Sequence, residues 1–424
     1  MDLDPRLIRR YHKLVKSHMK PNNLLSAGVK GNLESNDLFT QTQATWRFLN
    51  NETCKLSELI KPILNTAVTQ SDQLCRNYAL IAHDWSGLNY KSHSSKKDRF
   101  GVHNTQELGY ELQASLLLSD EQGGPLAPIA MNVVTGKRVL STYREDGSLD
   151  ETHLEELSKR IDYIEGCGLK KPMIHIVDRE GDSAQLMRVL GDRKWLVRCR
   201  SNSRVEHQGV SIRVDHLAKE LTYTLSREIN YKGRKAHQRF ASTEVCITRE
   251  SQPKKKVDNK KVRVKGDAIR CRFIVSQVQD ESGAVLAWWY LVTNVTDVCM
   301  STLGLWYYWR WSIESFFKLL KSAGMHLEQW QQESGEAIAR RLLVACMACV
   351  FIWQLAETKG PEAGELRKVL IKLSGRQMKY GVEYTRPALL AGLCSLLSTL
   401  DLLEQYDIQE LKFILRKTLG EQLV

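Results

Sequence analysis

Residues 172–182 read PMIHIVDREGD, and residues 183–190 continue as SAQLMRVL. The short apolar run that ends at Asp178 predicts a buried strand, and the spacing of apolar residues after it predicts a helix. A buried strand followed directly by a helix is the repeating unit of α/β domains. This stretch therefore predicts an α/β domain with an acidic residue at the end of one strand.

The segments before and after this stretch extend the same pattern. Residues 78–83 form another apolar run, which stops at Asp84 before the turn-like Trp85, Ser86 and Gly87. Residues 108–118 and 126–134 predict two further strands around the turn-forming sequence DEQGG, and residues 150–163 predict a helix. We expect a mixed sheet in which Asp84 and Asp178 lie at the ends of two separate strands.

The remaining chain divides by pattern into three further regions. Residues 1–75 are mainly helical and polar, residues 205–295 form short alternating segments such as 222–225 and 272–275, and residues beyond 303 are helical. The predicted organisation is an α/β core interrupted by an all-β insertion and flanked by helical regions. Its boundaries are 1–75 for the N-terminal helices, 76–204 with 296–358 for the core, 205–295 for the insertion, and 359–424 for the C-terminal helices.

The chain carries an excess of positive charge. Its 424 residues include 61 Lys and Arg against 49 Asp and Glu, a formal net charge of +12, and 42% of them are hydrophobic, which argues against intrinsic disorder. The excess indicates a polyanionic partner, but composition alone does not separate DNA, RNA and an acidic membrane.

The basic residues gather in three clusters. The first lies on one side of an amphipathic helix, the second surrounds the apolar residues 195–197, and the third contains an alternating basic stretch, 261–265, that predicts a strand. Three interpretations of the first cluster remain open: a solvated surface helix, a membrane-surface helix and a phosphate-binding helix. The presence of three clusters in one chain favours a long polyanion as the partner. Their members are Arg6, Arg9, Arg10, Lys13, Lys16 and Lys20; Arg193, Lys194, Arg198, Arg200 and Arg204; and Lys254, Lys255, Lys256, Lys260, Lys261, Arg263 and Lys265.

Cysteine usage and apolar runs bear on the compartment. The ten cysteines are scattered singly except for Cys346 and Cys349, which we expect to pack in the core of an apolar helix. The longest fully apolar run, residues 342–353, is shorter than the roughly 20 residues of a membrane-spanning helix. We therefore expect a cytoplasmic protein that does not cross a membrane.

A helix predicted over residues 302–321 carries a stripe of polar side chains. Tyr307, Arg310, Glu314 and Lys321 fall within an arc of roughly 60° on a helix of 3.6 residues per turn. A solvated face with an Arg310–Glu314 ion pair is one interpretation. Because Trp, Tyr, Phe and Leu surround the stripe on the other sides, we favour a stripe that faces a cleft.

Glu314 completes a set of three acids with Asp84 and Asp178. Carboxylates that converge repel one another unless cations lie between them, and hard oxygen ligands suit Mg²⁺ or Mn²⁺. Two such ions about 3.5–4 Å apart are the usual apparatus for attack on a phosphodiester. The acids and the basic clusters together predict a metal-dependent enzyme that acts on nucleic acid.

These motifs resemble those of a known family. The spacing Tyr307-x2-Arg310-x3-Glu314-x6-Lys321 is similar to the Y-R-E-K signature of bacterial insertion-sequence-four D-D-E transposases, which include the Tn-five transposase. Residues 178–182, DREGD, resemble the family's DRExD motif, and residues 84–90, DWSGLNY, resemble its first catalytic segment. The resemblance runs from about residue 44 to the end of the chain.

The resemblance implies a ribonuclease-H-like core whose triad, Asp84, Asp178 and Glu314, binds two Mg²⁺ ions. It also implies a β-rich insertion between Asp178 and Glu314, which fits the pattern of residues 205–295. Such enzymes free a transposon by hydrolysis, form and reopen a DNA hairpin, and transfer both ends into target DNA. Tyr307, Arg310 and Lys321 would then hold phosphates beside the scissile bond.

The resemblance further assigns DNA contacts and an assembly. Trp289 is similar to a family Trp that stacks on a flipped base, although Trp288 is adjacent and a core role is the alternative. The basic helix with Arg6, Arg9, Arg10 and Lys13 would grip the inverted repeats, and Arg198 and Arg200 would contact DNA through their charge. The helices after about residue 361 would form a homodimer on double-stranded DNA, at the nucleoid of a bacterial cytoplasm.

Two alternatives to an active transposase remain open. One is a catalytically inactive or domesticated DNA-binding derivative, and the other is a structure-specific nuclease without strand transfer. His83 departs from the family pattern, and we expect it to be a packed strand residue.

Overall fold

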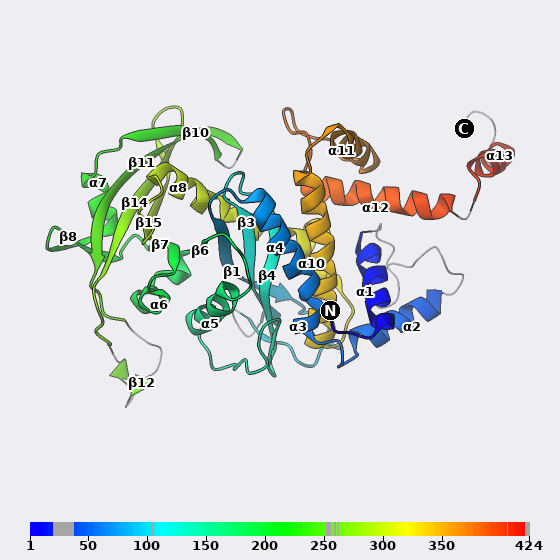
Figure 1. The fold of residues 1–424 in the computed structure, drawn as a ribbon, viewed down its shortest axis with the longest axis horizontal. Coiled ribbons are helices and arrows are strands. Elements are labelled where there is room, and N and C mark those ends of the chain that lie inside the picture. The colour runs from blue at the N-terminus through cyan, green and yellow to red at the C-terminus, as the bar shows by residue number, and fades with distance from the viewer. Residues whose placement is uncertain are drawn as a thin grey trace.

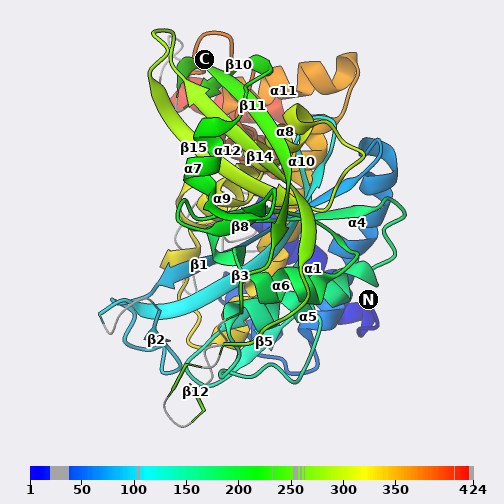
Figure 2. The ribbon, with the colours of Figure 1, turned by 90° about the vertical axis from the view of Figure 1, so that its left-hand side faces the viewer.

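The computed structural model of the chain describes residues 1–19, 38–102, 106–231, 233–251, 256–257, 260–261, 263–404 and 406–419. Most strands of this described part belong to one sheet of thirteen strands, and helices cover both of its faces (Figure 1). The view turned by 90° shows how strongly this sheet twists along its length (Figure 2). The predicted mixed α/β class is confirmed.

The centre of the sheet has the order β4-β3-β1-β6-β7. β1 pairs antiparallel with β3, β3 pairs antiparallel with β4, and β1, β6 and β7 run parallel. This order and these directions are those of a ribonuclease-H-like core, as predicted. The strands are β1 (Ala79–Asn89), β3 (Leu108–Ser119), β4 (Pro125–Val134), β6 (Met173–Val177) and β7 (Lys194–Arg198), with short edge strands β2 (Phe100–Gly101) and β5 (Val139–Ser141).

Alternate side chains of these strands enter two separate cores. Ile176 and Leu196 belong to the larger apolar cluster, whereas Val177, Trp195 and Val197 belong to the smaller one. Helices α5 (His153–Glu165) and α6 (Ala184–Leu190) cover the smaller cluster, and α5 begins at a capping box formed by Thr152 and Glu155. The larger cluster is covered by α4 (Lys61–Leu74), α8 (Met300–Trp309), α9 (Trp311–Lys318) and α10 (Gly335–Glu357).

Most strands of the β-rich segment extend the same sheet beyond β7 in the order β15-β14-β11-β8-β9 (Figure 1), with β10 paired to β11, whereas β12 and β13 form a separate two-stranded sheet. One short helix, α7, interrupts this segment, so the prediction of an all-β segment was wrong. Residues 222–224 also precede β10 rather than forming a strand. The elements are β8 (Arg204–His207), β9 (Val210–Arg213), α7 (Val214–Glu220), β10 (Leu225–Tyr231), β11 (Arg234–Ile247), β12 (Lys256–Val257), β13 (Lys260–Lys261), β14 (Ile269–Gln279) and β15 (Val285–Thr293).

Two predicted boundaries near the acids differ from the structure. β1 does not stop at Asp84 but continues to Asn89, because β3 pairs with it along its whole length. The helix expected over residues 302–321 is divided at Arg310 into α8 and α9, and a π-helical turn, η3 (Leu319–Ala323), follows. A short 3₁₀ turn, η4 (Leu327–Gln329), then leads to α10.

Helices also occupy both ends of the chain. The apolar side of α1 (Pro5–His18) packs on α10 through Tyr11, Leu14 and Val15, and Lys16 forms an ion pair with the buried Asp401 at 2.9 Å. Lys20, Lys254, Lys255 and Val262 lie outside the described residues. Of the predicted basic strand 261–265, Lys261 belongs to β13, Val264 forms an isolated bridge with Ser251, and Arg263 and Lys265 belong to no strand. The other helices are α2 (Leu38–Leu49), α3 (Leu56–Leu59), α11 (Pro361–Leu373), α12 (Arg386–Leu403) and α13 (Ile408–Leu419).

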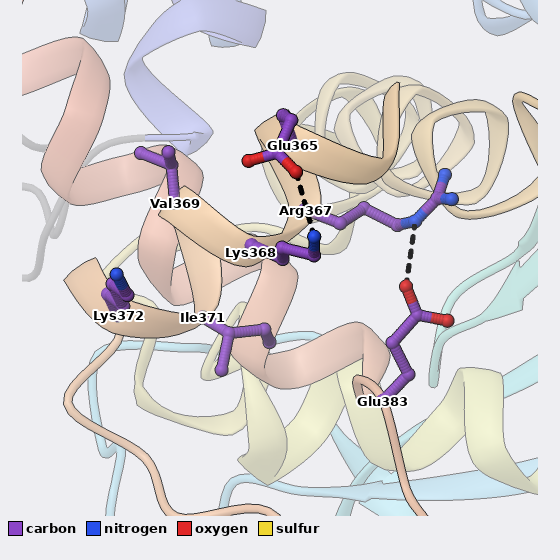
Figure 3. Close-up of a pocket in the computed structure, with 7 residues that line it drawn as sticks. All are labelled: Glu365, Arg367, Lys368, Val369, Ile371, Lys372 and Glu383. Carbon is purple, nitrogen blue, oxygen red and sulfur yellow. Dashed lines mark hydrogen bonds and ion pairs between the residues drawn. The ribbon is translucent and has the colours of Figure 1, made fainter. Parts of the chain in front are cut away.

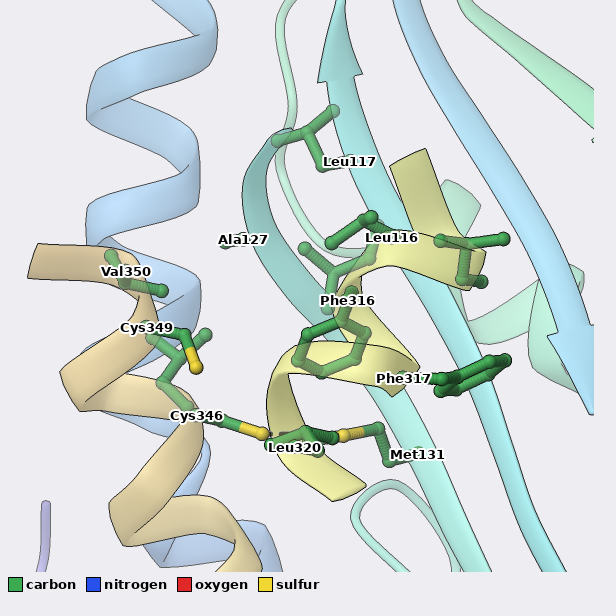
Figure 4. Close-up of a cluster of buried hydrophobic side chains, with 14 of the residues drawn as sticks. Leu116, Leu117, Ala127, Met131, Phe316, Phe317, Leu320, Cys346, Cys349 and Val350 are labelled. Carbon is green, nitrogen blue, oxygen red and sulfur yellow. Dashed lines mark hydrogen bonds between the residues drawn. The ribbon is translucent and has the colours of Figure 1, made fainter. Parts of the chain in front are cut away.

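Two helices of the described part, α10 and α12, are long and apolar enough by composition to cross a membrane. The sequence expectation considered only fully apolar runs and missed both. In α10, 83% of the relevant window is buried inside the protein, which marks it as a core helix; in α12 the share is 33%. Cys346 and Cys349 of α10 are free, fully buried thiols that pack among Leu116, Met131 and Phe316, as expected (Figure 4).

At Gly392 the backbones of α11 and α12 lie close together. A Cβ at this position would overlap the carbonyl group of Leu370. Gly392→Ala should therefore separate the two helices and lower the free energy of unfolding by about 1–3 kcal/mol. Gly364→Ala is the matched control in α11, because a Cβ there meets nothing within 4 Å, and it should stabilise by about 0.5–1 kcal/mol. Urea unfolding checks both, and equal midpoints for the two variants would contradict the assignment.

Candidate active site

The central strands bring Asp84 and Asp178 to one level of the sheet. The parallel ladder between β1 and β6 ends at the pair His83–Val177, so Asp84 and Asp178 are the next residues on neighbouring strands. Because successive side chains of a strand alternate between faces, Asp84 points to the face opposite His83, and Asp178 follows directly after the end of β6. Helix α9, which carries Glu314, packs against β1. The negative charges of Asp178 and Glu314 both act on Asp84, so the structure brings the three acids together.

Arg310 lies between two of these acids. One Nη atom of its guanidinium is 3.2 Å from Oδ2 of Asp84, and the other is 2.6 Å from Oε1 of Glu314. The guanidinium is buried, and its Nε atom has no hydrogen-bond partner among the described residues. The Arg310–Glu314 pair of the solvated-face interpretation is thus present, but Arg310 is buried and also pairs with Asp84, whereas Glu314 stays partly exposed.

Burial makes Asp84 an unusual carboxyl group. Its pKa is raised to about 6, first by burial, while Arg310 and the Trp85 backbone N–H lower it and the charges of Asp178 and Glu314 raise it. The net effect is a carboxylate that is costly to keep charged without further cations.

Asp84→Asn should stabilise the protein in the presence of EDTA at pH 7 but change its stability little at pH 4. The pKa of about 6 lies above the unfolded value of about 3.9, so the folded protein holds a proton that the unfolded chain has released. Stability therefore falls as pH rises between these two values, by roughly 1–3 kcal/mol for this group. Urea unfolding at both pH values measures the difference, and a gain that does not depend on pH would refute the assignment.

The rings of Tyr307 and Trp289 pack against each other next to Arg310. Tyr307 is buried, its ring lies 5.8 Å from that of Trp289, and burial raises the pKa of its hydroxyl, while the charges of Arg310 and Arg198 lower it. Trp289 is itself buried among aromatic rings, whereas Trp288 lies on the other face of β15 beside Tyr223. Of the two candidates, Trp289 is therefore the one that packs against Tyr307.

Lys321 approaches the site from the π-helical turn. Its Nζ atom donates a hydrogen bond to the carbonyl oxygen of Gly87 in β1 and lies 4.0 Å from Glu328, and burial lowers its pKa. A π-helical turn has a different hydrogen-bond spacing from an α-helix. The position of Lys321 therefore does not follow from the single α-helix that the sequence predicted.

The loop after Asp178 is held by its own acidic residues. Oδ1 of Asp178 accepts a hydrogen bond from the backbone N–H of Glu180 at 2.8 Å. Asp182 is buried and accepts hydrogen bonds from the backbone N–H of Arg200 at 2.8 Å and from the side chain of Arg249. Asp182 thus joins this loop to Arg200, in the segment after β7, and to Arg249, in the β-rich segment. The side chain of Arg200 is exposed.

The basic residues of α1 lie on another part of the fold. Arg6, Arg9 and Lys13 are exposed, whereas Arg10 is partly buried, and burial lowers its pKa. Helix α1 packs mainly against α10 and α2, not against the strands that carry the acids (Figure 1). A surface formed by these residues would therefore be separate from the site around Asp84.

The three acids of the candidate site are possible ligands for metal ions. Among the described residues, no group of three His, Cys, Asp or Glu side chains is arranged to hold a metal ion. Carboxylate oxygens are nevertheless donors that suit Mg²⁺ or Mn²⁺, and the charges of Asp178 and Glu314 both raise the pKa of Asp84, which a cation placed among the three would offset. A cavity of about 310 Å³ lies elsewhere, on α11 and the segment before α12, and is lined by Arg367, Lys368 and Glu383 among others (Figure 3).

Several polar residues around the site were not predicted. His175, two strand positions from Val177, contacts His83, and His153 lies between Glu111 and Glu180 at 3.0 and 3.2 Å. Hydrogen bonds to these two carboxylates raise the pKa of His153 to about 9. The sequence could have pointed only to His83 and His175, because each lies in an apolar run that ends at a candidate acid, Asp84 or Asp178.

Comparisons with known proteins identify the domain that contains these residues. A family model described as "Transposase DDE domain" matches residues 77–351. A solved structure titled "Cryo-EM structure of piggyBac transposase synaptic complex with hairpin DNA" is similar at 10% identity with a TM-score of 0.38, over 99% of this chain and 77% of that chain. That likeness is too distant to support any argument about function. No curated protein sequence matches the chain.

Proposed function

Because this chain belongs to the transposase DDE domain family, we propose that it is a cut-and-paste transposase of the insertion-sequence-four type, similar to the Tn-five transposase. The observation that carries this proposal is the meeting of Asp84, Asp178 and Glu314 on one face of the sheet with Arg310 among them. Members of the family generally use divalent metal ions. The substrate would be double-stranded DNA that carries the element's inverted repeats.

The three acids are proposed to hold two Mg²⁺ ions, for which Mn²⁺ would substitute. When bound, such ions activate the attacking oxygen and stabilise the leaving oxygen at a phosphodiester. Arg310 is suited to bind a phosphate through its planar fork, and Tyr307, whose ring lies 5.8 Å from the Arg310 guanidinium, and Lys321, which bonds to Gly87 of β1, would help to position the same strand. Hydrolysis, hairpin formation and strand transfer would follow at this one site.

The proposed DNA contacts outside the site rest on charge and exposure. Arg6, Arg9 and Lys13 are exposed on α1, where they would grip the inverted repeats, with Arg10 beside them. Arg198 lies near Tyr307, and Arg200 is exposed on the following loop. Trp289 would stack on a flipped base only after the aromatic rings that cover it move aside.

We propose a homodimer in the DNA complex and action at nucleoid DNA in a bacterial cytoplasm. Support for the dimer comes from exposed apolar side chains on α12 and α13, including Leu400, Leu403 and Phe413. Support for a reducing compartment comes from the ten cysteines, all of which are free thiols.

The test is incubation of the purified protein with Mg²⁺ and DNA that carries the element's own terminal repeats. We expect double-strand cuts at the ends, hairpin intermediates and products joined to target DNA. Binding without cutting would indicate an inactive or domesticated derivative, and cutting without joining would indicate a structure-specific nuclease. Either outcome would overturn the proposed function.

A further inference from the structure

Two buried histidines lie directly behind the acids. His83 precedes Asp84 on β1, and His175 lies three residues before Asp178 on β6; both side chains are fully buried. Nε2 of His83 is 2.9 Å from Nδ1 of His175, and the two rings are stacked with their centroids 5.2 Å apart. A hydrogen bond between side chains therefore crosses the same two strands that carry the acids.

Every ring nitrogen of this pair has a partner. Nδ1 of His83 is 2.8 Å from the Ser115 hydroxyl on β3, and Nε2 of His175 is 2.9 Å from the Glu165 carboxylate, the last residue of α5. Because an ionised carboxylate only accepts, His175 carries its proton on Nε2 and accepts at Nδ1. His83 then donates from Nε2, and Ser115 donates to its Nδ1.

The position of this pair matters because the backbone ladder ends there. His83–Val177 is the final pair between β1 and β6, so no further ladder bond fixes Asp178 relative to Asp84. The two carboxylates repel each other, as the effect of Asp178 on the pKa of Asp84 indicates. A directional side-chain bond at the end of the ladder resists the separation of the strands in a way that an apolar pair would not.

Burying four polar ring nitrogens costs free energy unless each has a hydrogen-bond partner. Two aliphatic side chains would fill the same space without that cost. Glu165 and Ser115 anchor the pair to α5 and β3, so the bond ties three strands and one helix together behind the acids. We propose that His83 and His175 are positioning residues that fix the ends of β1 and β6, and with them Asp84 and Asp178, relative to each other. This inference rests on the proposed function.

A matched pair of variants at His83 tests the proposal on the full chain. His83→Gln keeps an N–H donor at the position of Nε2, whereas His83→Met has a similar length and volume but cannot donate. The first measurement is Mn²⁺ binding without DNA, followed by the electron paramagnetic resonance signal of free Mn²⁺. We expect His83→Met to weaken binding by about tenfold and His83→Gln to recover most of this loss.

The second measurement separates positioning from general damage. Binding to DNA that carries the terminal repeats should be equal in all three proteins, while the cleavage rate at saturating DNA should fall only in His83→Met. Equal losses in the two variants, or none in either, would overturn the proposal. If the wild-type protein neither binds Mn²⁺ nor cuts DNA, the proposed function fails and the inference falls with it.

A spectroscopic measurement covers the case in which His83→Met does not fold. Long-range ¹H–¹⁵N spectra of the wild-type protein with labelled histidine should show two buried neutral rings, each protonated at Nε2. A ring protonated at Nδ1, or at both nitrogens, would break the chain of donors from Ser115 to Glu165 and overturn the proposal.

Discussion

Asp178→Asn should lower the rate of DNA cleavage by about 10³-fold or more, while binding to the terminal repeats and folding remain as in the wild type. The reason is chemical, since an amide cannot supply the negative charge that a carboxylate offers to a metal ion. The fold should survive because Oδ1 of an Asn side chain can still accept the hydrogen bond from the Glu180 backbone N–H, which is 2.8 Å long in the structure.

The matched control is Asp280→Asn. Asp280 lies in the turn between β14 and β15, and its Oδ1 also accepts hydrogen bonds from backbone N–H groups, those of Ser282 and Ala284, each at 2.9 Å. The same change at a turn-capping Asp outside the site should leave cleavage unchanged. Measurement of single-turnover cleavage and of DNA binding by gel shift decides the case, and an Asp178→Asn protein that still cuts at the wild-type rate would remove Asp178 from the triad.

Arg310→Met should reduce cleavage by about 10²–10³-fold and, in the same protein, strengthen Mn²⁺ binding in the absence of DNA. The two effects have one cause. The guanidinium neutralises Asp84 and Glu314 at 3.2 and 2.6 Å, so it competes with a metal ion for these carboxylates, yet it is also the group suited to a phosphate. Replacing Arg310 would leave Asp84 and Glu314 available to the metal ion and would remove the proposed contact between Arg310 and a DNA phosphate.

Arg310→Lys is the control that keeps the charge. A lysine ammonium cannot form two parallel bonds in the fixed geometry of a guanidinium, so we expect cleavage to lie between that of the wild type and that of Arg310→Met. Isothermal titration with Mn²⁺ and single-turnover kinetics give the two readouts. Weaker Mn²⁺ binding in Arg310→Met would show that Arg310 supports the metal site instead of competing for it.

The regions around the acids were predicted well where periodicity is local. The strand before Asp178, the two strands that follow Asp84 along the chain and the helix before β6 all form close to their predicted positions. Errors arose where pairing elsewhere in the chain decides an element's length. β1 runs past Asp84 because β3 continues beside it, and the helix 302–321 divides at Arg310, although no proline or glycine marks the break.

The candidate site shows the same division. Four polar residues at helical spacing and two acids after apolar runs identified the participants, because these features depend on residue type and short spacing. Their interactions could not be predicted, since Arg310 and Asp84 are 226 residues apart and His83 and His175 are 92 apart. Contacts at such separations depend on which strands become neighbours and on the side of each strand that a helix covers.

The amino-acid sequence alone predicts the α/β class, the interrupted core and the acidic and basic side chains of the candidate site. It does so because burial and backbone hydrogen bonding impose a periodic pattern of apolar residues that is visible in any short stretch of sequence. Only the folded sheet decides that Trp289 and not Trp288 lies beside Tyr307, that Arg310 lies between two acids, and that two histidines join the strands behind them. Strand order and face fix these neighbours, and both arise from the packing of segments far apart in the chain.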